Sequence, residues 1–105
     1  MEEALELQYF SLIAQAGDAR SCFIEAIGCA GEGKFEKANQ LLNQGHAAYV
    51  NAHKMHSDMI ACEAGGQTKY EGLLAMHSED LMMSAETFEI IAEQMVDLYR
   101  RLQNR

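Results

Sequence analysis

The sequence of 105 residues contains no proline, and its longest apolar runs are short. Proline interrupts helices, so its absence removes the strongest local obstacle to long ones. Hydrophobic residues make up 49% of the chain, and the residues between them are mostly strong helix formers. We therefore predict an all-α protein, and the length fits one domain spanning residues 1–105.

Basic residues are also scarce, since 8 Lys and Arg stand against 16 Asp and Glu, for a formal net charge of −8. Nucleic acids and anionic membranes favour basic patches, so both are poor partners, whereas a basic protein would be a good one. No apolar run reaches the roughly 20 residues of a membrane span, and the acidic start MEEALELQYF lacks the positive region of a secretory signal. We expect a soluble, cytoplasmic protein.

The three cysteines are odd in number and form no CxxC pair, which argues against a disulfide framework or a zinc site. Cys22, Cys29 and Cys62 are better explained as buried thiols in a reducing compartment.

Apolar residues recur in alternating steps of three and four along three segments, which predicts helices over about residues 2–30, 34–63 and 68–102. Thr68 and Glu71 have the spacing of a capping box at the start of the third helix. Each helix would be about 40 Å long, so the three can form an antiparallel up-down bundle with short connections.

Glycines mark the predicted breaks. Residues 31–33 (GEG) and 64–66 (AGG) would end the first two helices, the second most simply with a left-handed glycine. Gly17, inside the first helix, predicts a kink or a close helix contact.

Two apolar stripes run along the third predicted helix, and each is interrupted by a reactive side chain. His77 interrupts the stripe Leu74, His77, Leu81, Ser84, Phe88, Ile91, Met95, Leu98 and Leu102. Asp80 interrupts the stripe Leu73, Met76, Asp80, Met83, Thr87 and Ile90. One stripe suffices to seal a helix in its own bundle, so the second indicates contact with another chain. Residues three apart are neighbours on a helix, so His77 and Asp80 could face one cleft.

A neutral imidazole has a nucleophilic nitrogen and can accept a phosphoryl group without a base, although His77 could equally be a packed or rim histidine. Asp80 could be a solvated residue at the edge of its stripe. If several copies of the helix met around an axis, their aspartates would need a shared cation, for which Mg²⁺ is the natural candidate. His46, His53 and His56 favour surface or packing roles, because HxxH lacks the spacing of the HExxH motif.

Five motifs spread over nearly the whole chain are familiar in combination: AGDARS (16–21), GEGKFEKA (31–38), AHK (52–54), LLAMHSEDLMM (73–83) and DLYRRL (97–102). In these motifs the chain resembles the lactose/cellobiose-type IIA components of the bacterial phosphoenolpyruvate-dependent sugar phosphotransferase system. The resemblance implies a homotrimer of three-helix protomers, a nine-helix bundle. It implies that His77 accepts a phosphoryl group from the carrier protein HPr and passes it to a cysteine of a IIB component for disaccharide uptake. It also implies that Asp80 from three chains holds one divalent ion, Mg²⁺.

Two residues depart from the family pattern after the active histidine, which usually reads Ala-Gln-Asp-His-Leu-Met. Glu79 replaces an amide that could donate to a phosphoryl oxygen, and a carboxylate pointing the same way would repel that oxygen. Leu81 replaces a second histidine. The alternative function is a helical phosphotransfer module or an oligomerisation adaptor without a role in sugar transport, and a fourth helix would favour the phosphotransfer module.

Overall fold

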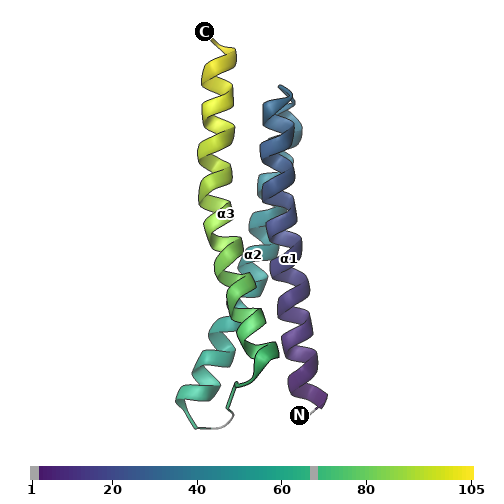
Figure 1. Ribbon diagram of the computed structural model, residues 1–105, viewed down its shortest axis with the longest axis vertical. Coiled ribbons are helices and arrows are strands. Elements are labelled where there is room, and N and C mark those ends of the chain that lie inside the picture. The colour runs from purple at the N-terminus through teal and green to yellow at the C-terminus, as the bar shows by residue number, and fades with distance from the viewer. Residues whose placement is uncertain (1–2, 67–68) are drawn as a thin grey trace.

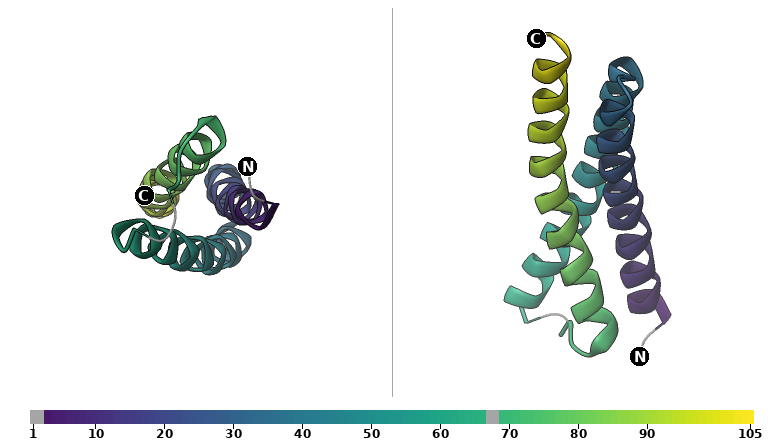
Figure 2. Two further views of the ribbon diagram at one scale, coloured as in Figure 1. Left: turned by 90° about the horizontal axis from the view of Figure 1, so that it is seen from below. Right: turned by 45° about the horizontal axis from the view of Figure 1, so that its top comes forward.

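The computed structural model describes residues 3–66 and 69–105 of the chain. Its three α-helices are α1 (Glu3–Gly31), α2 (Phe35–Ala64) and α3 (Leu73–Gln103). They run up, down and up, and the two chain ends lie at opposite ends of a rod of 56 × 21 × 20 Å (Figure 1). Seen along the rod, the helices occupy the corners of a triangle (Figure 2). The predicted antiparallel three-helix bundle is confirmed.

Both predicted glycine breaks are confirmed. Gly33 has a φ of 81° in the turn between α1 and α2, and Gly66 has a φ of 74° just after the C-cap of α2. Glycine adopts this left-handed conformation without the steric cost that a side chain would add.

The predicted start of the third helix was wrong. α3 begins at Leu73 and is preceded by Gly72, whose φ of 98° is not helical. Thr68 lies outside the described residues, and Glu71 precedes the helix, so it is not at the position that a capping box needs. The ring of Tyr70 packs edge-on against Tyr9, with the ring centroids 5.9 Å apart. This tertiary contact holds the non-helical residues 69–72 that precede α3.

α1 is the central helix, because it contacts both other helices extensively while α2 and α3 contact each other less. Its buried residues follow the predicted steps of three and four, and Tyr9, Leu12 and Phe23 are the largest fully buried side chains. α1 continues without interruption through Gly17. Gly45 of α2 has no room for a side chain, because an added Cβ would lie 2.6 Å from Cε1 of Phe23.

The stripe that seals α3 against its own bundle is not the predicted one. The buried residues lie one position later and are mostly small: Ala75, Ser78, Met82, Ala85, Ala92 and Val96. The predicted stripe through Leu74 and Leu81 is half-buried near the start of α3 and partly exposed further along. When the packed residues are small, a stripe predicted from the large apolar residues can therefore lie one position away from the residues that are buried. The second predicted stripe is exposed along its length.

Two histidines of α2 bridge to α3. Nδ1 of His46 lies 2.7 Å from a carboxylate oxygen of Glu89, and Nε2 of His56 contacts a carboxylate oxygen of Glu79. His53 packs beside the ring of Tyr49. These contacts confirm surface and packing roles for the three histidines.

All three cysteines are free thiols, but only Cys29 is buried, while Cys22 and Cys62 are half-buried. The prediction of three buried thiols was therefore only partly correct. Across residues 3–66 and 69–105, none of the helices has the length and hydropathy of a membrane span.

Candidate functional site

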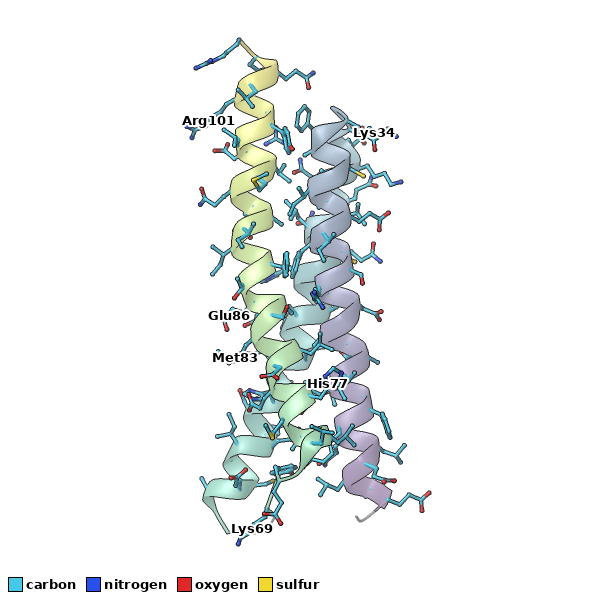
Figure 3. The ribbon with its side chains drawn as sticks, in the orientation of Figure 1. Lys34, Lys69, His77, Met83, Glu86 and Arg101 are labelled. Atoms are coloured by element: carbon cyan, nitrogen blue, oxygen red, sulfur yellow. The ribbon has the colours of Figure 1, made fainter. Side chains whose placement is uncertain are left out.

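His77 lies in the second turn of α3 with its side chain exposed. It is flanked along its stripe by Leu74 and Leu81, which are both half-buried and anchor this edge of the helix to the core. Figure 3 shows the imidazole on the side of α3 that faces α1. It makes no hydrogen bond or ion pair with any other described residue, so both ring nitrogens are free to meet an incoming group.

Asp80 lies on the outer face of α3, which we define as the exposed stripe Leu73, Met76, Asp80, Met83, Thr87 and Ile90. The neighbouring side chains of Met76 and Met83 are each 63% exposed. Figure 3 shows Met83 pointing away from the bundle, on the opposite side of α3 from His77. Asp80 is thus a carboxylate set in an exposed apolar surface.

The structure does not bring His77 and Asp80 into one cavity. Three residues along a helix turn by about 300°, so the two side chains differ in direction by about 60°. His77 lies on the edge toward α1, whereas Asp80 lies on the outer face and borders a cavity beside α2 that His77 does not line. The prediction of one shared cleft was wrong within a single protomer.

Glu79 does not point toward His77. Two residues along a helix turn by about 200°, so Glu79 lies almost on the opposite side of α3. Its carboxylate engages the imidazole of His56 on α2, and the Glu79 side chain is about half exposed (50%). The repulsion that a carboxylate beside the phosphoryl group would cause is therefore absent in this arrangement. His56 and Glu79 are 23 residues apart in the sequence, so no local pattern predicted that they pair.

The other residues around His77 have structural roles. Ser78 is buried, and its Oγ donates a hydrogen bond of 2.8 Å to the carbonyl oxygen of Ala75. Leu81 packs against the core and reaches toward Gly17, where an added Cβ would lie 3.8 Å from Leu81 Cδ2. A leucine at this position supports the contact between α1 and α3.

One protomer does not contain a complete metal site in its described part, since no three of its His, Cys, Asp and Glu side chains could hold an ion together. It presents Asp80 as a single carboxylate on the outer face. A metal at this position would need further oxygen ligands, from water or from other copies of the chain.

Comparison with known proteins gives consistent matches. The family model described as "PTS system, Lactose/Cellobiose specific IIA subunit" matches residues 7–100. The lactose-specific EIIA component of Staphylococcus epidermidis is 30% identical over 99 residues, covering 94% of this chain and 95% of its own. The oligo-beta-mannoside-specific EIIA component of Bacillus subtilis is 36% identical over 91 residues, covering 87% and 83%.

Solved structures show the same fold. The cellobiose-specific enzyme IIA of Bacillus anthracis superposes with a TM-score of 0.95 at 31% identity, covering 100% of this chain and 96% of that one. The IIA component in the IIA(chitobiose)–HPr complex of Escherichia coli superposes with a TM-score of 0.82 at 26% identity, covering 98% and 99%.

Proposed function

Because the chain belongs to the lactose/cellobiose-specific IIA family of the sugar phosphotransferase system, we propose that His77 carries the phosphoryl group that such a component transfers. The donor would be the phosphohistidine of HPr, and the acceptor a cysteine of a IIB component that serves disaccharide uptake. A relative has been solved in complex with HPr, which supports HPr as the donor.

The proposed transfer has two displacement steps. A ring nitrogen of His77 attacks the phosphorus of phospho-HPr, so that a new N–P bond forms while the N–P bond to the carrier's histidine breaks. The thiolate of the IIB cysteine then attacks the same phosphorus and releases His77. The protein's main tasks in such a transfer are positioning and charge stabilisation, not further covalent chemistry.

The observation that carries the proposal is the exposed imidazole of His77, free of partners among the described residues, on a helix edge that the core holds in place. Leu74 and Leu81, which are both half-buried, flank it on α3. A partner that docks here can bury their remaining apolar surface at the centre of its contact. The net charge of −8 favours a partner with basic residues around its own histidine.

We further propose that the protein is a homotrimer in which the outer faces of three α3 helices meet. This arrangement would bury Met76, Met83 and Ile90, which the single protomer leaves exposed. It would also bring three Asp80 carboxylates together. Buried like charges are costly, so one Mg²⁺ held by the three oxygen ligands fits this donor set. The free thiols fit the reducing cytoplasm, where we place the protein.

The test is the intact mass of the purified protein after incubation with phosphoenolpyruvate, enzyme I and HPr. We expect a gain of one phosphoryl group that is labile in acid and absent in His77→Ala. The matched control is His53→Ala, which removes another exposed histidine and should be phosphorylated like the wild type. An unmodified wild-type protein beside fully phosphorylated HPr would reject the proposal, and so would a phosphorylated His77→Ala.

A further inference from the structure

Arg20 of α1 carries a positive charge that the protomer does not pair. Its guanidinium lies over the ring of Phe88 of α3, with Cζ 5.3 Å from the ring centroid. The residue is half-buried, and its buried Nε has no hydrogen-bond partner in the described part of the chain. Nor does the side chain form an ion pair with any residue in 3–66 or 69–105. The ring thus holds a guanidinium that still lacks the carboxylate such a group normally binds.

Arg20 lies on the same edge of the bundle as His77, further along the rod. Gly17, which approaches Leu81 of α3, precedes Arg20 by three residues, or about 4.5 Å along α1. Since α1 and α3 run in the same direction and the guanidinium reaches Phe88, it lies at the height of residues 84–88 of α3. This height is about 10–16 Å from that of His77. A phosphoryl group on His77 is therefore not the anion that Arg20 would bind.

Glu86 lies at this height on the other side of α3. Figure 3 shows Glu86 on the same side of α3 as Met83, opposite the side that carries His77. Burial raises the pKa of Tyr49, and the charge of Glu86 raises it further, so this carboxylate lies near the Tyr49 hydroxyl of α2. Glu86 is nevertheless exposed. A carboxylate accepts several hydrogen bonds, so contact with one hydroxyl leaves acceptor sites for a guanidinium.

The other carboxylates near Glu86 on α3 are engaged or lie at another height. Glu79 and Glu89 each contact a histidine of α2. Glu93 is seven residues beyond Glu86, about 10 Å further along the helix. Glu86 forms no ion pair with the residues that the structure describes. It is therefore the carboxylate best placed to meet a cation at the height of Arg20.

Three-fold symmetry brings these two sides together. In the trimer proposed above, the outer faces of three α3 helices surround an axis along the rod. The α1 side of α3 in one protomer then lies next to the opposite side of α3 in the next, and each residue keeps its height. We propose, as an inference that rests on this trimer, that Arg20 of each protomer binds Glu86 of a second copy of this chain.

Apolar side chains and the net charge support a contact between copies at this edge. Phe10 and Ile24 of α1 are 56% and 45% exposed, and together with Gly17 they recur in steps of seven on one side of the helix. A second copy would find apolar surface to bury beside Arg20. The net charge of −8 makes copies of the chain repel each other, and an arginine opposite a glutamate reduces that repulsion.

A double-mutant cycle tests the pair, with the dissociation constant of the full-length trimer measured by sedimentation equilibrium. Arg20→Gln and Glu86→Gln should each weaken the trimer about tenfold, because three partly exposed ion pairs are lost. The variant with both changes should be no weaker than either single variant. Glu93→Gln is the matched control and should assemble like the wild type. Circular dichroism shows whether each variant remains helical.

A charge exchange sharpens the test. Glu86→Arg places two guanidinium groups opposite each other and should weaken the trimer more than Glu86→Gln does. Adding Arg20→Glu should restore assembly, whereas adding it to Glu93→Arg should not. If Arg20→Glu does not fold, the cycle with glutamine still decides the question.

Independent effects of Arg20→Gln and Glu86→Gln on a trimeric protein would overturn this contact and leave the trimer in place. A wild type that is monomeric at micromolar concentration would overturn both. If Arg20→Gln kept the dissociation constant of the wild type but slowed phosphoryl transfer from HPr, Arg20 would contact the carrier, and the pairing with Glu86 would be wrong.

Discussion

The two faces of α3 use apolar residues in opposite ways. The buried face is built largely from small side chains, Ala75, Ser78, Ala85 and Ala92, and the outer face presents Leu73, Met76, Met83 and Ile90 to solvent. Small residues allow α3 to approach α1 closely, while large exposed apolar side chains add nothing to the stability of the single protomer. A contiguous apolar surface of this kind is typical of a site of association. The inner face thus determines the fold of the protomer, and the outer face is the surface through which we propose that copies of the chain associate.

The largest effect should come from charges placed on the outer face. Met83→Glu combined with Ile90→Glu would bury six carboxylates in a trimer, at a cost of several kcal/mol for each buried ion. We expect sedimentation equilibrium at micromolar concentration to show a helical monomer for this variant and a trimer for the wild type. Gln40→Glu combined with Asn43→Glu adds the same charge to the exposed side of α2 and should leave the mass unchanged. If the variant with both Met83→Glu and Ile90→Glu remained a trimer, the contact between protomers would lie outside the outer face.

The next effect concerns the inner face. Ala85 is fully buried, so Ala85→Leu forces a larger side chain into a filled contact and should lower the free energy of unfolding by about 1–3 kcal/mol. Thr87→Leu adds a leucine two residues later on the outer face and is the matched control. Urea unfolding at a protein concentration that keeps both variants monomeric measures the difference. Equal destabilisation by the two leucines would contradict the assignment of the faces.

The contrast between the faces also explains what the sequence could predict. The buried residues of α1 and α2 follow the predicted steps of three and four, and large residues such as Tyr9, Leu12 and Met59 mark the buried side. On α3 the large residues lie beside the contact or opposite it, so the same reasoning selected the wrong stripe. The start of α3 was predicted wrongly because the prediction used the capping-box spacing of Thr68 and Glu71. It took no account of the packing of Tyr70 against Tyr9.

The candidate site was predictable in part. His77 and Asp80 stood out because they interrupt apolar stripes, and the structure shows both exposed. Their different directions, the pairing of Glu79 with His56 and the cavity beside α2 all depend on contacts between segments far apart in the chain. Periodicity along a single helix carries no information about such contacts.

A smaller effect is expected from the carboxylate in the outer face. In the proposed trimer, Asp80→Leu removes the charges that require Mg²⁺ and replaces them with apolar contact. Removal of divalent ions by a chelator should shift the wild type toward monomer by a few-fold in its dissociation constant, and it should leave Asp80→Leu trimeric. Sedimentation with and without chelator measures both. An equal response of the two proteins to the chelator would show that Asp80 is not a ligand.

The smallest effect should come from the edge between the two faces, where His56 pairs with Glu79 and His46 pairs with Glu89. Both pairs are partly exposed, so His56→Gln and His46→Gln should each lower the free energy of unfolding by at most about 1 kcal/mol. Because Glu79 points nearly opposite to His77, its release from His56 should leave the rate of phosphoryl transfer from HPr within about twofold of the wild type, as should His46→Gln. Rapid-quench measurement of phosphoryl transfer gives the rate for each variant. A large loss confined to His56→Gln, and restored by adding Glu79→Gln, would mean that His56 restrains a carboxylate that can otherwise reach the phosphoryl group.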